Sequence, residues 1–205
     1  MARKMFREAV ETYSAADQNS PVIANKIGIA YHQMLELELA KRNYERAAKL
    51  DPKYSEAVNN LGTIYYARKN FRKAVSYYNR ALKLKPNSAS IYSNLGTAQF
   101  ARKKYKDAAE AYDIALKLDP EVFEHKGTQG VLLQERSVAE RAKFHFYLAK
   151  TYAKAGAVER ALLYIRKALE EGFKERDKFQ KEPEFATLQE LPEFKQLMAV
   201  EPRVL

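Results

Sequence analysis

A block of 34 residues occurs twice in succession in this chain. Residues 55–88 and 89–122 align without a gap and share 14 of 34 positions. A fixed period of this length is typical of proteins built from stacked repeats, in which each unit packs only on its neighbours. This repeat constrains the possible folds more than any single motif in the sequence, and it favours a solenoid.

Each unit contains two helical patterns. Ala74, Tyr78 and Ala81 are spaced i, i+4, i+7, so they share one face of a helix. Gly62 and Ala74 are small residues placed where the two helices of a hairpin would cross closely. Pro86 marks the end of the unit, because proline disfavours a helical conformation at the residue before it. With only 7 Gly and 7 Pro in 205 residues, the composition also favours helices, so we predict an all-α fold.

The second helix of the unit can be traced through most of the chain. Its pattern is an alanine, three residues, an aromatic residue, two residues and a second alanine, with Ile165 in place of the aromatic in the last copy. The copies begin at Ala2, Ala40, Ala74, Ala108 and Ala161. The matching first helices contain Leu61 and Leu95, which we expect to be buried within the hairpins.

This pattern resembles the tetratricopeptide repeat, which has Leu-Gly and Tyr in its first helix, Ala-x3-Phe in its second and a closing Pro. Four full units match, at 21–54, 55–88, 89–122 and 142–175. The resemblance implies antiparallel helical hairpins stacked into a right-handed superhelical solenoid, with the first helix of each repeat lining a concave groove. It also implies a non-catalytic scaffold that binds an extended peptide or a partner protein in that groove.

Three segments depart from the repeat. Residues 1–20 look like a partial repeat with only the second helix, so we expect either that the natural chain continues upstream or that this helix is a cap. Leu35, Leu37 and Leu39 occupy the turn of the first repeat, where polar residues are usual. A homo-oligomer formed through the N-terminal half-repeat is therefore one alternative function.

Residues 123–141 form an insertion loop, interpreted either as a spacer or as a lid over the groove. Ser137 and Glu140 have the spacing of a capping box that starts the next helix. Residues 176–205 are similar to the closing segment of many bacterial tetratricopeptide proteins, so we interpret them as a C-terminal capping segment. Pro183 and Pro192 each indicate the first turn of a short helix there.

The sequence offers no catalytic motif and no cofactor site. Cysteine is absent, which excludes disulfides and thiolate metal sites, and the three histidines lack metal-ligand spacing. The segment from Gly127 to Gly130 lacks the Lys-Ser/Thr ending of a phosphate-binding loop. No apolar run approaches the roughly 20 residues needed to span a membrane. We expect a soluble protein without catalytic residues, metal or cofactor, from a bacterial cytoplasm or periplasm.

The resemblance implies a set of binding positions on the first helices, at spacings of three and four residues. Asn60 and Asn94 lie 34 positions apart and look like the asparagine ladder in the repeats of protein O-glycosyltransferases, which holds a peptide backbone. The alternative is that these asparagines are simply solvated. The implied groove residues are Asn25, Asn59, Asn60, Thr63, Tyr66, Ser93, Asn94, Thr97, Phe100, Phe146, Tyr147, Lys150 and Lys154.

A second candidate surface is basic. The formal net charge is +10, and cations gather at the hairpin turns of the two best-matching repeats. This basic rim consists of Arg68, Lys69, Arg72, Lys73, Arg102, Lys103, Lys104 and Lys106. It would bind nucleic acid or an acidic partner, although most charge runs are only solvated faces. Nucleic acid is disfavoured, because no sequence motif of a known nucleic-acid module occurs.

Overall fold

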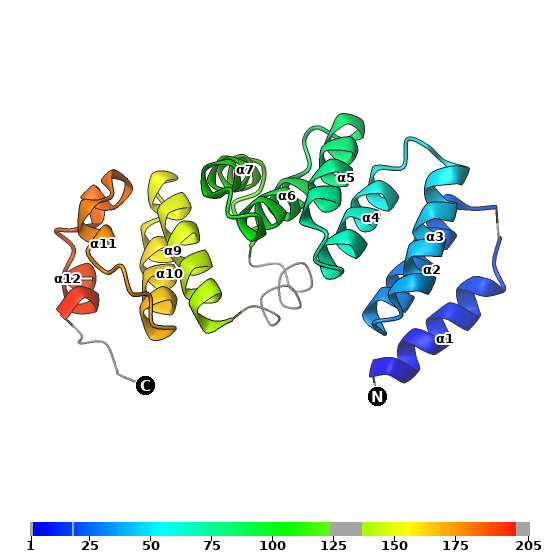
Figure 1. Cartoon of the computed structure of the whole chain (residues 1–205), viewed down its shortest axis with the longest axis horizontal. Helices are drawn as coiled ribbons and strands as arrows, with labels where there is room; N and C mark the ends of the chain where they lie inside the picture. The colour runs from blue at the N-terminus through cyan, green and yellow to red at the C-terminus, as the bar shows by residue number, and fades with distance from the viewer. Residues whose placement is uncertain (1, 18, 124–136, 200–205) are drawn as a thin grey trace. The chain divides into compact units, whose positions relative to one another are not determined.

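The computed structural model describes residues 2–17, 19–123 and 137–199, and every regular element in these ranges is helical (Figure 1). The all-α prediction is confirmed. The helices are α1 (Ala2–Ser14), α2 (Pro21–Gln33), α3 (Leu37–Leu50), α4 (Ser55–Ala67), α5 (Phe71–Leu84), α6 (Ala89–Ala101), α7 (Tyr105–Leu118), α9 (Val138–Lys154), α10 (Val158–Glu170), α11 (Lys178–Lys181), the 3-10 helix η1 (Pro183–Leu188) and α12 (Pro192–Ala199).

The chain forms two compact units, Met1–Lys104 and Tyr105–Leu205. In the first unit each helix from α1 to α6 packs against the next one in the sequence, as expected for a repeat protein. In the second unit α9 packs against α7, α10 and η1, and α10 also packs against α12. The boundary between the units falls inside the predicted repeat 89–122, so the division into four repeats stays a prediction.

Local sequence signals explain where several helices begin. The Ser20 hydroxyl accepts a hydrogen bond from the Ile23 backbone N–H at 3.3 Å, and Pro21 opens α2. The predicted capping box at Ser137 and Glu140 is confirmed, with both reciprocal hydrogen bonds present. Prolines also open η1 and α12, as predicted. The serine and glutamate side chains at these helix starts bind backbone N–H groups that have no partner inside the helix.

One left-handed residue ends the first helix of each pair. Leu35, Lys69 and Lys103 have φ of 64°, 59° and 62°, and Gly156 follows α9 with φ of 75°. At each of them two backbone hydrogen bonds close a Schellman motif, such as Lys69 N–H to Tyr66 C=O at 2.8 Å. The same turn geometry therefore recurs along the chain, and only one of the four turns uses glycine.

Substitution at these turns should change stability in opposite directions. A non-glycine residue in the left-handed region costs about 1–2 kcal/mol, part of which is offset because glycine is more flexible when unfolded. Lys69→Gly should therefore raise the free energy of unfolding by up to about 1 kcal/mol. Gly156→Ala should lower it by about 1 kcal/mol, although no atom lies within 4 Å of the added methyl group. Urea denaturation of both variants tests this, and equal signs would contradict it.

In the hairpin of α4 and α5, small residues pack against one large buried side chain, as the predicted close crossing requires. Ala74 and Tyr78 are fully buried, and Leu61 is 3% exposed. A methyl group added at Gly62 would lie 2.6 Å from the Tyr78 ring, so the α4 backbone and this ring are in direct contact. Leu95 is only partly buried, so the prediction of its burial is wrong. The α6 face that carries Leu95 instead buries Ile91 and Ala98 more deeply.

Two predictions at the edges of the repeats are not settled. The lid and spacer interpretations concern residues 124–136, which lie outside the described residues. At the N-terminal end, α1 packs against α2, while Leu35 is 71% exposed and Leu39 is 38% exposed. Self-association through this end stays a prediction. Within the described ranges, no helix combines the length and the apolar run that crossing a membrane requires.

Candidate functional site

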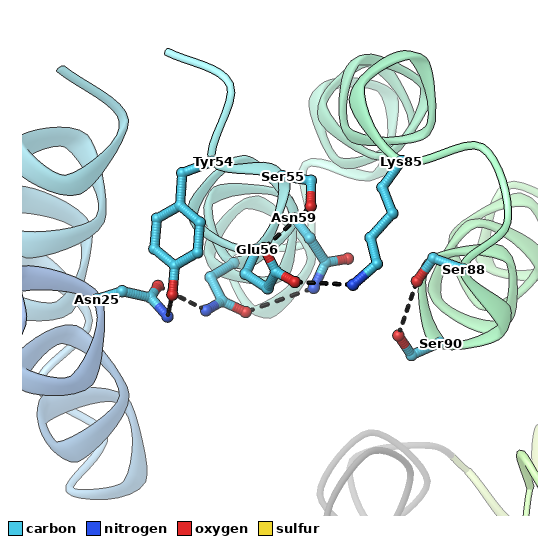
Figure 2. Close-up of polar contacts among 9 residues, drawn as sticks. Asn25, Tyr54, Ser55, Glu56, Asn59, Lys85, Ser88 and Ser90 are labelled. Atoms are coloured by element: carbon cyan, nitrogen blue, oxygen red, sulfur yellow. Dashed lines mark hydrogen bonds and ion pairs between the residues drawn. The ribbon is translucent and has the colours of Figure 1, made fainter. Parts of the chain in front are cut away.

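Four asparagines form a hydrogen-bonded ladder across α2, α4 and α6. The Asn94 side-chain amide donates to Asn59 Oδ1 at 3.1 Å, and Asn60 donates to Asn25 Oδ1 at 2.9 Å. Within α4, Asn59 donates to Asn60 Oδ1 at 3.4 Å. At the other end, Asn25 donates to the Tyr54 hydroxyl at 3.4 Å (Figure 2). The ladder thus runs through three successive first helices within one unit.

The ladder leaves hydrogen-bonding capacity on its two central members. A neutral amide has two N–H groups and two acceptor lone pairs, and Asn59 and Asn60 each use one N–H and one lone pair in the ladder. Asn59 and Asn60 are partly exposed, whereas Asn25 and Asn94 are 4% and 8% exposed. The accessible part of the ladder therefore lies at Asn59 and Asn60. The interpretation that Asn60 and Asn94 are merely solvated is wrong for Asn94.

An ion pair lies beside the ladder at the start of α4. Glu56 Oε1 accepts a hydrogen bond from Lys85 Nζ at 3.0 Å, and the Ser55 hydroxyl donates to Glu56 Oε2 at 3.0 Å (Figure 2). Burial alone would raise the pKa of Glu56, but the bonds from Lys85 and Ser55 outweigh it and hold this pKa below its ordinary value. The sequence did not predict a place for Glu56, Lys85 or Tyr54 in this region, because none of them follows the 34-residue pattern of the asparagines.

Several predicted binding positions of the first unit are buried. Tyr66 is 6% exposed and packs on Phe71 with ring centroids 5.2 Å apart. Ser93, Thr97 and Phe100 are 2%, 5% and 5% exposed. The prediction that Tyr66 and Phe100 offer apolar area to a ligand is therefore wrong for this structure. Thr63 is partly exposed, and its hydroxyl donates to the Asn59 carbonyl at 3.2 Å.

In the second unit, the C-terminal segment covers the predicted binding face of α9. Phe146 is 2% exposed, and its ring stacks on Phe173 with centroids 4.5 Å apart. Phe179 and Phe185 approach the same ring at 5.2 and 5.9 Å. Phe146 is thus a core residue, and its assignment to a ligand surface is wrong.

The two predicted lysines of α9 already have carboxylate partners. Lys150 Nζ lies 2.6 Å from Glu182 and 3.3 Å from Glu184. Burial would lower the pKa of Lys150, but these two carboxylates outweigh it and raise the pKa. Lys154 pairs with Asp113 at 3.1 Å. Neither lysine is therefore an unpaired cation that awaits an acidic ligand, and Glu182 and Glu184 are contacts that the sequence analysis missed.

Tyr147 is the remaining predicted position in this unit. It is partly exposed, and its ring stacks on Tyr105 with centroids 5.1 Å apart. Lys143 Nζ lies 4.1 Å from the centroid of the Tyr105 ring. Burial raises the pKa of Tyr147, with the nearby Lys143, Lys178 and Lys150 acting in the opposite direction.

Part of the basic rim lines an open pocket of the first unit with a volume of about 650 Å³. Five rim cations line it, together with an asparagine and a phenylalanine. The lining residues are Arg68, Lys69, Asn70, Phe71, Arg72, Arg102 and Lys104. The other rim residues, Lys73, Lys103 and Lys106, are exposed outside it.

The histidines and carboxylates of the described residues do not cluster as metal ligands. Within them, no group of three or more His, Asp or Glu side chains could hold a metal ion. His125 lies outside this part of the chain. His145 lies 2.9 Å from Glu171 on the hairpin of α9 and α10. Burial lowers the pKa of His145, with Glu171 acting in the opposite direction.

The fold and the ladder define a protein of stacked helical hairpins whose first helices carry hydrogen-bonded asparagines. Family models identify these hairpins: one described as TPR repeat matches residues 62–101, and two described as tetratricopeptide repeat match residues 89–122 and 23–54. The chain therefore contains tetratricopeptide repeats over residues 23–54 and 62–122. A search of curated proteins finds no match.

Solved structures agree with this assignment. A crystal structure of MamA is similar with 22% identity and a TM-score of 0.54, over 81% of this chain and 88% of that chain. The first TPR of Spaghetti (RPAP3) bound to the HSP90 peptide SRMEEVD gives 26% identity and a TM-score of 0.50, over 58% of this chain and 92% of that one. YrrB is described as a TPR protein with an unusual peptide-binding site. It gives 17% identity and a TM-score of 0.53, over 95% of this chain and 87% of that chain.

Proposed function

We propose that this chain is a non-catalytic scaffold that binds an extended segment of a partner protein along α4. The contact is centred on Asn59 and Asn60. The observation that carries the proposal is the ladder, because it holds both amides in fixed orientations and leaves each with a spare donor and acceptor. A peptide unit offers one donor and one acceptor in return.

The neighbouring structures support a peptide as the ligand. The Spaghetti domain, at 26% identity, was solved with a bound peptide, and YrrB is described as peptide-binding. The ladder also favours a backbone contact over a side-chain-specific one, since amides recognise any peptide unit. Fixed donors lower the ordering cost of binding, although two hydrogen bonds contribute only about 1 kcal/mol each. We therefore propose modest affinity with low sequence specificity at Asn59 and Asn60.

The double substitution Asn59→Ala, Asn60→Ala should weaken peptide binding about tenfold or more. Peptides would first be selected from a random displayed library against the intact chain, and their affinities would then be measured by calorimetry. The matched control is Asn79→Ala, Asn87→Ala, which removes two exposed asparagines outside the ladder. Circular dichroism at the assay temperature would show that each variant is folded. Unchanged affinity in the folded Asn59, Asn60 variant would rule out the ladder as the binding site.

A further inference from the structure

The pocket of the basic rim is bounded by the turn after α4 and the turn after α6. Arg68 and Arg102 lie 34 residues apart, and each is the C-cap of its helix. The left-handed residues Lys69 and Lys103 give the two turns the same backbone geometry, so the turns present their side chains in register. Because of this repetition, cations from two turns line one pocket.

The fold does not require cations at these positions. The equivalent turn after α2 contains Leu35 and Glu36, and the turn after α9 contains Gly156 and Ala157. All four turns close with the same pair of backbone hydrogen bonds. Lysine at the left-handed position is also less favourable than the glycine found after α9. The helix dipole favours cations at the C-termini of α4 and α6, but the turns after α2 and α9 show that the fold does not require them there.

Arg72 gives a second indication, because its charge opposes the helix in which it lies. It stands in the first turn of α5, where the helix dipole favours an acidic side chain. The equivalent positions of α3 and α10 hold Glu38 and Glu159. Arginine at this position disfavours the helix slightly, whereas it adds a guanidinium to the pocket.

Most of the cations that line the pocket have no ion-pair partner among the described residues. Arg68 forms an ion pair with Glu38, and Arg102 Nη1 donates to Gln99 Oε1 at 3.0 Å. Within the described residues, Lys69, Arg72 and Lys104 form no ion pair. Clustered like charges repel one another, so a ligand that brings carboxylates relieves this repulsion and gains charge-assisted hydrogen bonds.

The shape and lining of the pocket favour a peptide over a nucleic acid. Phe71 is half-buried at its edge and provides an apolar surface among the cations. Nucleic-acid sites follow a long line of phosphates with a basic stripe, whereas these cations line one open depression of about 650 Å³. Guanidinium groups such as those of Arg72 and Arg102 match carboxylates in a bidentate geometry.

We propose that this pocket is a second binding site, separate from the asparagine ladder, and that it takes an acidic segment of a partner protein. The segment would contain glutamate or aspartate side chains for Arg72, Arg102 and Lys104, next to an aromatic or aliphatic side chain for Phe71. The ladder would bind backbone with little side-chain preference, and this pocket would add selection for acidic partners.

The test uses the full chain and a fluorescein-labelled peptide of alternating glutamate and phenylalanine, with binding measured by fluorescence anisotropy. The triple variant Arg72→Gln, Arg102→Gln, Lys104→Gln should bind this peptide at least about tenfold more weakly than the parent chain. The control, Lys49→Gln, Lys53→Gln, Lys83→Gln, removes the same net charge at exposed positions outside the pocket and should change affinity by less than about twofold. The Asn59→Ala, Asn60→Ala variant should retain the binding.

Three results would overturn the proposal. Equal losses of peptide affinity in the pocket triple variant and in the lysine control would show that only the overall positive charge of the chain attracts the peptide. Loss of binding in the Asn59, Asn60 variant alone would place the acidic peptide on the ladder. Tighter binding of an oligothymidylate of equal formal charge, with a steeper salt dependence, would identify the pocket as a nucleic-acid site. An affinity for the acidic peptide that depends on the pocket cations and not on Asn59 and Asn60 supports the proposal. This holds whether or not the library-selected peptides prove to bind the ladder.

Discussion

Replacing Phe179 with alanine should lower the free energy of unfolding by about 3–5 kcal/mol. Phe179 is fully buried in α11, and its ring lies 5.2 Å from Phe146, 5.5 Å from Phe173 and 5.4 Å from Phe185, centroid to centroid. The substitution removes the ring that the other three share. It leaves a cavity that cannot easily collapse, because each of the remaining rings belongs to a different part of the unit.

The loss should appear first where the C-terminal segment covers α9. In a repeat protein each element is stabilised by its neighbours, so unfolding can begin at a weakened end. Hydrogen exchange should become faster in α11, η1 and α9, while the helices of the first unit change little. The chain has no tryptophan, so circular dichroism in urea is the suitable global measurement. Leu163→Ala is the control, since Leu163 is 38% exposed in α10 and should cost well under the loss at Phe179.

Phe146 shows why the sequence did not predict this cluster. The repeat register places Phe146 and Lys150 on the face of α9 that a ligand would contact. Glu182, Glu184 and Phe185 lie outside the repeat, so the period says nothing about where their segment docks. In the structure this segment packs against α9 and neutralises Lys150. The repeat period predicts which residues share a face of a helix. It does not predict which of these faces a segment outside the repeats will cover.

The sequence placed asparagines on one face of the first helices, but it did not predict the hydrogen bonds between them. The 34-residue period relates Asn60 to Asn94 as equivalent positions. The hydrogen bonds instead join Asn25 to Asn60 and Asn59 to Asn94, which are 35 residues apart. Each of these asparagines thus meets a partner offset by one residue from its own equivalent in the neighbouring repeat. The sequence therefore identifies the helix face, and the offset decides which amides remain accessible.

Tyr78→Ala should lower the free energy of unfolding by about 3–5 kcal/mol, because Tyr78 is fully buried against the α4 backbone. Gly62→Ala should also lower the free energy of unfolding, by about 1–3 kcal/mol, because it overpacks the site where Tyr78→Ala leaves a cavity. The added methyl group would lie 2.6 Å from Tyr78 Cε1, so the ring or the helix must shift. This cost exceeds the gain of about 1 kcal/mol that alanine normally brings to a helix interior.

The two substitutions together should reverse the sign of the change at Gly62. Once Tyr78 is alanine, the methyl group at position 62 meets an empty space, and the helix-propensity gain of up to about 1 kcal/mol remains. The fourth hairpin already carries such a pair, since Ala149 and Ile165 hold the equivalent positions and both are fully buried. A double-mutant cycle by urea denaturation measures the coupling. If Gly62→Ala costs the same in both backgrounds, the ring of Tyr78 is not what keeps glycine at position 62, and the close approach of the two helices needs another cause.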